Sequence, residues 1–122
     1  MRSVFGDSIL KWLLRCWPHA SLNADYSAFF FLRAHQLTRR NGAVGLLATK
    51  TIAQGDTART GLAHLIAEHS CNVRFAKSSF PWPGTAAVVA ALVVFQKGSW
   101  QGQRYLDDRS VSNISAVLDD QE

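Results

Sequence analysis

The chain has 122 residues, of which 48% are hydrophobic and 18% are charged, and its formal net charge is +4. This composition excludes a disordered chain, a collagen-like chain and a disulfide-stapled scaffold, and the length allows one globular domain at most. The two cysteines, Cys16 and Cys71, have no paired spacing and predict reduced, buried thiols rather than a zinc site or a disulfide.

The first predicted element is a short helix near the N-terminus. Apolar residues recur at helical spacing over residues 8–16, between Asp7, a candidate cap, and Pro18. Charged side chains interrupt this stretch, so it lacks the clean apolar core of a signal peptide. No apolar run in the chain reaches the roughly 20 residues that a membrane helix needs. We therefore expect a cytoplasmic protein without a membrane segment.

A second helix is expected from Asn23, its candidate cap, to about Arg39. Its first two turns are apolar on nearly every side, and such a helix requires cover on more than one side. Asn41 and Gly42 then provide a left-handed stop.

The middle of the chain predicts a strand, a helix and a second strand. Residues 43–49 form a short apolar run that is typical of a buried strand, although periodicity alone leaves a helix open. A loop over residues 50–56 leads to a helix that Asp56 or Thr57 can cap and that ends near Glu68. Its apolar stripe includes Leu62, Leu65 and His69, whereas Thr60 and His64 lie off the stripe. Residues 71–77 then alternate as a strand. Strand, helix and strand together form the right-handed crossover unit of an α/β sheet.

The most apolar segment, residues 86–95, predicts a central strand that is covered on both faces. Its connection from Lys77 is too short for a parallel crossover helix, so the strand must run antiparallel to its predecessor. We expect it to lie between the two parallel strands. The fold class is therefore α/β, with too little sheet for the apolar surface present. Either the chain associates through an exposed sheet edge or it is part of a larger domain, and we favour the second interpretation.

The C-terminal segment, residues 99–122, predicts a weak hairpin with Asp107 and Asp108 at its turn, followed by a loose acidic end. Residues 107–122 hold five acidic groups and one basic group, a net charge of −4, so residues 1–106 carry +8. A basic body is compatible with a polyanionic partner such as nucleic acid, and an ordinary solvated basic surface is the alternative.

Candidate chemistry lies in the loops that follow the two parallel strands, because ligands of open α/β sheets bind beyond the carboxyl ends of such strands. In the first loop, Thr49, Lys50 and Gln54 lie beside a helix N-terminus and are candidates for contacting an anion or a phosphate. In the second, Phe80 and Trp82 lie on a turn stiffened by prolines, where they either stack on a nucleobase or close the end of the core.

Other sites receive little support from the sequence. It contains no dinucleotide-binding, phosphate-loop, nucleophile-elbow or zinc-protease motif. Histidines are distributed over different predicted elements, which argues against a metal site; they are His19, His35, His64 and His69.

Two blocks of the sequence resemble a known enzyme family. They are residues 23–62 (NADYSAFFFLRAHQLTRRNGAVGLLATKTIAQGDTARTGL) and residues 78–98 (SSFPWPGTAAVVAALVVFQKG). Both are similar to the later part of the catalytic domain of amino-group DNA methyltransferases, in particular the large single-chain type II restriction-modification enzymes that methylate adenine at N6. The resemblance covers about residues 5–118, and its specific motifs are ATKTIAQGDT and FPWPGTAAV.

The resemblance implies a partial S-adenosylmethionine-dependent methyltransferase sheet of the Rossmann-like kind. Residues 43–49, 71–77 and 86–95 correspond in it to strands five, six and seven, the last of which is antiparallel. The family binds S-adenosylmethionine through a glycine-rich loop after the first strand. It holds the flipped-out adenine with an Asn-Pro-Pro-aromatic motif after the fourth strand. Neither motif occurs in these 122 residues, so the resemblance assigns no catalytic residue to this chain.

The resemblance does transfer several contact positions. Phe80 matches the aromatic residue that packs against the flipped base. Phe30 aligns with an apolar position that lines the adenine pocket of the cofactor, and a plain core role is its alternative. The loop that follows Thr49 matches a block at the mouth of the active site. Gln54 and Asp56 fit this block, whereas Lys50 replaces an expected Asn, which puts a polar role at that position in question. Asp56 alternatively serves only as a helix cap.

Two hypotheses of different classes follow. In the first, residues 1–98 are the C-terminal part of a methyltransferase catalytic domain and residues 99–122 lead towards a missing target-recognition region. The chain is then a fragment of an adenine-specific DNA methyltransferase, inactive alone. Its partners are DNA and, at the exposed sheet edge, a second copy or the missing N-terminal half. In the second hypothesis, the chain is a non-catalytic nucleic-acid-binding or assembly module. A third possibility is a small α/β enzyme of unrelated chemistry. The sequence does not support it, because it offers no group of acid, base and nucleophile residues.

Overall fold

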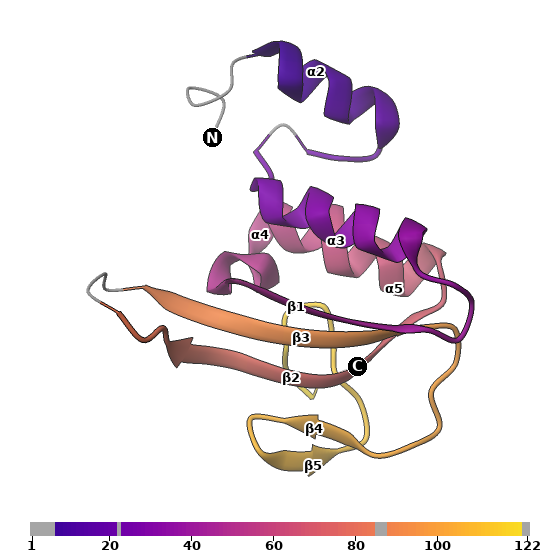
Figure 1. The fold of residues 1–122 in the computed structure, drawn as a ribbon, viewed down its shortest axis with the longest axis vertical. Coiled ribbons are helices and arrows are strands. Elements are labelled where there is room, and N and C mark those ends of the chain that lie inside the picture. The colour runs from indigo at the N-terminus through magenta and orange to yellow at the C-terminus, as the bar shows by residue number, and fades with distance from the viewer. Residues whose placement is uncertain (1–6, 22, 85–87, 121–122) are drawn as a thin grey trace.

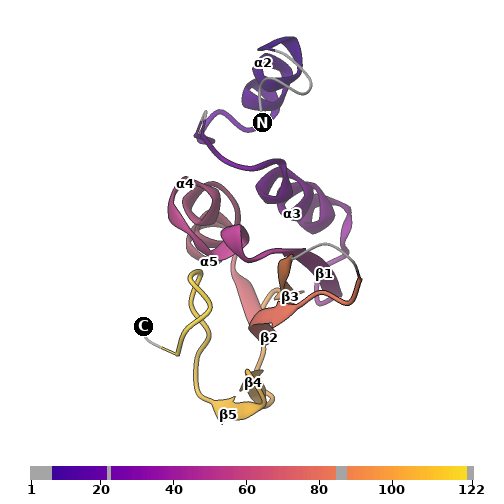
Figure 2. The same ribbon diagram turned by 90° about the vertical axis from the view of Figure 1, so that its left-hand side faces the viewer.

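A computed structural model describes residues 7–21, 23–84 and 88–120 of the chain. One five-stranded sheet, ordered β1-β3-β2-β4-β5, carries helices along one of its sides (Figures 1 and 2). The α/β fold class is therefore confirmed. The strands are β1 (Ala43–Thr49), β2 (Cys71–Pro81), β3 (Val89–Lys97), β4 (Arg104–Leu106) and β5 (Arg109–Val111).

Strand β3 lies between β1 and β2 and pairs antiparallel with both, so β1 and β2 run parallel to each other. This arrangement confirms the order that the short connection before β3 predicts. Strand β4 then adds to the far side of β2 in parallel, and β5 pairs antiparallel with β4.

The two faces of the sheet have different surroundings. In the β1–β3 ladder, Val44 pairs with Phe95 and Leu46 with Val93 on the side of the helices, which we call the covered face. The alternate residues of the ladder, among them Leu47 opposite Leu92, point to the other side, which we call the open face. The predicted cover on both faces of β3 is wrong for the described residues, because their helices all lie on one side of the sheet (Figure 2).

Helix α3 (Tyr26–Leu37) lies between the sheet and helix α2 (Asp7–Cys16) (Figure 1). On the side of α2, the ring of Phe29 lies 5.9 Å from that of Trp17. On the side of the sheet, Phe31 lies 6.0 Å from Phe95. The expectation that this apolar helix needs cover on more than one side is therefore confirmed.

The ends of α3 differ from those predicted. Asp25, and not Asn23, occupies the N-cap position. The helix ends at Leu37, and Asn41 adopts a left-handed conformation (φ 65°) in the turn into β1, where its N–H donates to the Lys97 carbonyl at 2.7 Å. The left-handed conformation predicted for Asn41 is therefore present, but it lies in the turn before β1, four residues past the last residue of α3.

The crossover between β1 and β2 begins with a 3-10 turn, η1 (Lys50–Ala53). It continues as one helical rod made of α4 (Gly55–Ala58), a π-helical turn η2 (Arg59–Ala63) and α5 (His64–Glu68). The wide π turn changes which residues face inward. Thr60 is buried and His69 is exposed, whereas the uniform helical spacing predicts the opposite for both.

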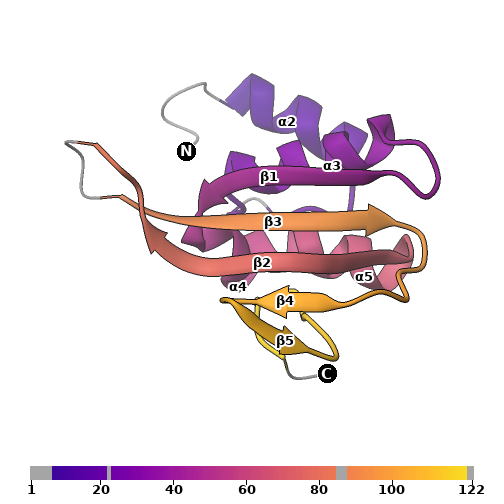
Figure 3. The ribbon, with the colours of Figure 1, turned by 60° about the horizontal axis from the view of Figure 1, so that its bottom comes forward.

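Strands β2 and β3 extend beyond the end of the sheet as a two-stranded arm, which comprises residues 78–84 and 88–90 (Figure 3). Strand β2 continues to Pro81, four residues past its predicted end. Strand β3 begins at Val89; the first part of its predicted span, residues 86 and 87, lies outside the described residues.

The predicted hairpin at the C-terminus is confirmed, with Asp107 and Asp108 in its turn at φ 52° and 68°. The predicted loose end is wrong for residues 112–120. Ile114 and Leu118 are buried in the same core as the helices and strands, because their apolar side chains gain more from burial than the segment loses by being ordered. No helix within the described residues is long and apolar enough to cross a membrane.

Candidate functional site at the carboxyl edge of the sheet

Strands β1 and β2 end at the same edge of the sheet, which we call the carboxyl edge. The turn η1, the starts of α3 and α4 and the arm are all found there (Figures 1 and 3). In α/β proteins this edge binds ligands, because loops rather than side-chain layers cover it. The structure therefore brings together the two loops that the sequence singles out.

A network of hydroxyl groups and one carboxylate joins the elements at this edge. The Thr49 and Thr51 hydroxyls lie 2.6 Å apart, and the Thr51 hydroxyl donates to the Asp25 carboxylate at 3.4 Å. The Asp25 N–H in turn donates to the Thr57 hydroxyl at 3.0 Å. Buried Ile52 anchors η1 beneath the network. The start of α3 is thereby fixed to the loop after β1 and to the first turn of α4.

Sequence reasoning missed the role of Asp25 and Thr51 in this network. The only available signal was the position of Asp25 at a helix start. It is 26 residues away from Thr51 along the chain, so no local spacing connects them. The contact arises because α3 and β1 pack against each other and run in opposite directions, which brings the start of the helix to the end of the strand (Figure 1).

The predicted loop residues occupy three different environments. Thr49 belongs to the hydroxyl network, while Lys50 and Gln54 expose their side chains at the carboxyl edge. Gln54 occupies the N-cap position of α4 but forms no side-chain cap bond. Asp56 lies inside the first turn of the helix and forms an ion pair with Arg59, so the prediction that it caps the helix is wrong.

Phe80 lies on the arm, within β2 and not in a free loop, and pairs with Ala90 of β3. Its half-buried ring lies 6.5 Å from the ring of Trp82, and the two planes are inclined by 49°. Trp82 is 45% exposed at the turn of the arm. The arm therefore presents two adjacent aromatic side chains at the carboxyl edge, with Phe80 level with Thr49 across β3 and Trp82 just past the end of β2.

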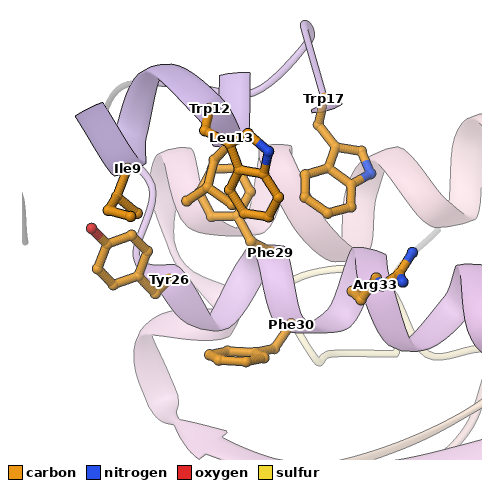
Figure 4. A pocket seen from close by; sticks show the side chains of 8 residues that line it. All are labelled: Ile9, Trp12, Leu13, Trp17, Tyr26, Phe29, Phe30 and Arg33. Atoms are coloured by element: carbon orange, nitrogen blue, oxygen red, sulfur yellow. The ribbon is translucent and has the colours of Figure 1, made fainter. Parts of the chain in front are cut away.

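Phe30 is 68% exposed on α3 and lines an apolar groove between α2 and α3 (Figure 4). The groove has a volume of about 410 Å³. Its lining is almost entirely hydrophobic and consists of Ile9, Trp12, Leu13, Trp17, Tyr26, Phe29, Phe30 and Arg33. Neither Phe80 nor the loop residues after Thr49 belong to this lining, so Phe30 faces a separate hollow.

The four histidines meet at the opposite edge, where α3 and α5 end. The rings of His19 and His64 stack at 3.5 Å, and the Nε2 atoms of His64 and His69 lie 3.1 Å apart. Buried His35 lies 5.5 Å from His69, and its Nε2 finds no hydrogen-bond partner among the described residues. The sequence distributes these residues over several elements, but the fold gathers them into one cluster.

Two of the four histidines, His35 and His64, have lowered pKa values. Burial is the main cause that lowers the pKa of His35, and nearby Lys97 and His69 lower it further. Burial also lowers the pKa of His64, with His19 and His69 adding to the effect and Glu68 opposing it. In the part of the chain that the structure describes, no group of three metal-ligating side chains is placed to hold a metal ion.

The two cysteines differ from each other. Burial raises the pKa of the Cys71 thiol to about 12, whereas Cys16 is exposed, so the prediction that both thiols are buried is wrong for Cys16. Cys16 lies on the last turn of α2 and lines a hollow together with residues of α3 and α5, among them Leu32 and His64.

Comparison with known proteins gives two similarities. A family model described as the DNA-methyltransferase domain of MmeI matches residues 10–106. A solved structure of the type IIL restriction-modification enzyme MmeI in complex with DNA is similar at a TM-score of 0.72 and 20% sequence identity, over 88% of this chain. The chain spans 17% of the length of that enzyme. No curated protein gives a match.

Proposed function

The chain belongs to the MmeI DNA-methyltransferase domain family, and from this membership we propose that it is half of a catalytic domain that methylates adenine at N6 in DNA. The observation that carries the proposal is the family match over residues 10–106, which spans all the elements from α3 to β4. The fold agrees with it, because β3 lies antiparallel between two parallel strands.

In this proposal the carboxyl edge is the mouth of the active site. Phe80 on the arm stacks against the adenine that is flipped out of the duplex, and its neighbour Trp82 widens the aromatic surface. Thr49, Lys50, Gln54 and Asp56 form the loop at the mouth. Base stacking on such an aromatic side chain contributes about 1–3 kcal/mol.

S-adenosylmethionine is the proposed cofactor, and when bound it supplies a methyl group on a positively charged sulfur. The groove beside Phe30 fits a flat purine ring, because it combines an aromatic ring that is 68% exposed with an apolar lining. Phe30 is thus proposed to hold the adenine of the cofactor. The chain's own residues bind and orient here, and we assign none of them to the chemical step.

DNA is the proposed partner. Residues 1–106 carry a net charge of +8, which favours a polyanion near the body of the molecule.

The free edge of β1 is the proposed contact for the other half of the domain or for a second copy. In the described ranges β1 pairs with β3 alone, so its second row of backbone groups is open for pairing. Residues 1–98 belong to the catalytic half in this proposal, and residues 99–122 lead to a target-recognition region.

A methyl-transfer assay tests the first part of the proposal. The purified 122-residue chain, incubated with radiolabelled S-adenosylmethionine and DNA, is expected to transfer no methyl group above background. The same chain, fused behind a segment that carries the family's glycine-rich loop and Asn-Pro-Pro-aromatic motif, is expected to produce N6-methyladenine, which mass spectrometry of the DNA nucleosides identifies. Methylation of cytosine by the fusion, or transfer by the chain alone, would contradict the proposal.

A binding assay tests the role of Phe80. Fluorescence anisotropy with a short duplex that contains 2-aminopurine is expected to show binding that weakens steeply with salt. Phe80→Ala is expected to weaken it by about tenfold, the value of one lost stacking contact. Tyr105→Ala, which removes an aromatic side chain that is 43% exposed on β4, is the control and should leave binding unchanged.

A non-catalytic nucleic-acid-binding or assembly module is the second candidate. The basic body and the aromatic arm favour it, because both function without a methyl donor. The fusion experiment separates the two candidates. DNA binding that depends on Phe80, combined with no methylation by a folded fusion, favours the module. Failure to bind DNA even at low salt leaves neither candidate supported.

A further inference from the structure

One residue of the turn between β4 and β5, Asp107, is hydrogen-bonded to β2 where the arm begins. Asp107 accepts two hydrogen bonds from Ser78, one from its N–H at 2.8 Å and one from its hydroxyl at 2.6 Å. The Asp107 N–H donates to the Ala76 carbonyl at 2.9 Å. Hydrogen bonds that a charged carboxylate accepts are about twice as strong as hydrogen bonds between neutral groups.

These bonds occur where the arm is least supported by its own ladder. The pairing of β2 with β3 shifts its register twice, first between Val73 and Phe75 and again between Lys77 and Phe80, after which Phe80 lies opposite Ala90. Ser78 therefore lies in the irregular stretch, in which a strand bends and loses ladder bonds. The Asp107 carboxylate accepts the Ser78 N–H at this position.

The conformation of the turn explains why this residue reaches Ser78. Asp107 has a φ of 52°, a left-handed conformation that Asp tolerates better than most residues, and the tight hairpin turn directs its side chain back to β2. Asp108 follows it at φ 68° but forms no such bond in the part of the chain that the structure describes. Two identical residues in one turn thus have different tasks.

We propose that Asp107 is a positioning residue that fixes the direction in which the arm presents Phe80. Ser78 lies two residues before Phe80, within the stretch where the register shifts, so the carboxylate holds β2 close to the aromatic residue. The proposal deepens the proposed function, since it relies on the base-stacking role of Phe80. In this proposal the β4–β5 hairpin belongs to the functional site at the carboxyl edge, because it orients the arm that carries Phe80.

Four variants of the full chain test this proposal: Asp107→Ala, Asp107→Asn, Ser78→Ala and Asp108→Ala. Asp107→Ala removes both bonds. Asp107→Asn keeps an oxygen for the Ser78 N–H and offers its amide to the Ser78 hydroxyl. It should therefore restore the amide exchange and the quenching of the original chain. Ser78→Ala removes the hydroxyl bond alone and should have an intermediate effect. Asp108→Ala is the matched control.

Two measurements are made on each variant. Amide hydrogen exchange at Phe80 and at Trp82, which donates to Val88, is expected to become about tenfold faster in Asp107→Ala. Exchange in the β1–β3 ladder should not change. Quenching of 2-aminopurine in bound DNA should fall in Asp107→Ala, return in Asp107→Asn and stay normal in Asp108→Ala.

The outcomes are distinguishable. Normal exchange in the arm of Asp107→Ala overturns the proposal, as does faster exchange spread evenly over the whole sheet, which would indicate a general structural role. Failure of Asp107→Asn to restore quenching also overturns it. If Phe80→Ala leaves quenching unchanged, the base-stacking role fails instead, and the exchange data still decide whether Asp107 holds the arm.

Discussion

The covered and open faces of the sheet are built from similar apolar residues but have opposite surroundings. On the covered face, Val93 and Phe95 are completely buried beneath the helices. On the open face, Leu47 is 52% exposed and Leu92 is half-buried. All-parallel sheets are covered on both faces, whereas a sheet with antiparallel pairs can leave one face to solvent. In the described residues the helices cover one face of this mostly antiparallel sheet, so its two apolar faces differ in burial because of their neighbours and not because of their residue types.

The largest expected difference in stability between the two faces comes from removing one aromatic ring from each of them. Phe95→Ala deletes a fully buried side chain and should lower the free energy of unfolding by about 3–5 kcal/mol. Phe75→Ala removes a half-buried ring opposite Val94 on the open face and should cost about 1 kcal/mol. Urea denaturation followed by circular dichroism measures both. Equal losses of unfolding free energy in the two variants would contradict the expected difference between the covered and the open face.

Adding a methyl group to a glycine on each side should have a smaller effect. Gly61 lies against α3 on the covered side, and a Cβ there would lie 3.2 Å from the Ala28 Cα, so Gly61→Ala should destabilise by about 1–3 kcal/mol. At Gly45 on the open face, the nearest atom to an added Cβ is the Val94 methyl at 3.6 Å, an ordinary contact. Gly45→Ala should leave the thermal midpoint unchanged or raise it slightly.

Acidification should weaken the covered side through its histidines. The folded pKa values of His35 and His64 lie below that of an unfolded histidine, about 6.5, so the unfolded chain binds more protons as the pH falls. Stability should be full above pH of about 6.5 and should decrease as the pH drops through the folded pKa values, by about 1.4 kcal/mol for each unit of pKa depression.

Denaturation curves at a series of pH values measure this loss. The double variant His35→Gln and His64→Gln should have a flatter profile between neutral and mildly acidic pH, whatever its absolute stability. An unchanged profile would place the proton uptake elsewhere in the molecule.

The smallest effect on stability is expected at Leu47. Leu47→Lys places a charge on the open face, where water solvates it, and should change the free energy of unfolding by less than about 0.5 kcal/mol. It should also reduce any self-association that sedimentation velocity detects, because it interrupts the exposed apolar surface. The neighbouring Leu46→Lys points to the helices instead and should destabilise the chain clearly.

Local pattern and chain length predicted much of the fold. Strand β1 has the bounds that its apolar run indicated, and the position of β3 followed from the short connection before it. The π turn η2 was not predictable, because its residues have the composition of an ordinary α-helix. Assuming a regular helix there placed Thr60 and His69 on the wrong sides.

The candidate site was predicted only in part. Residues 49–56 and Phe80 were singled out because loops at the carboxyl edge follow from strand order, and the structure does bring them to that edge. Their roles in binding remain predictions. The bond from Ser78 to Asp107 joins residues 29 positions apart, and the histidine cluster joins residues from three elements. Such contacts depend on tertiary packing, which no local spacing encodes.

The π turn between α4 and α5 also has a consequence for comparing relatives of different length. A π turn contains one residue more than the α turn that it replaces. Deleting exposed Arg59 would therefore turn the π turn into an α turn, and the residues before and after it would keep facing the same sides. A one-residue gap at this place in an alignment therefore signals a lost π turn between two helical segments whose buried sides are unchanged, and not a shortened loop.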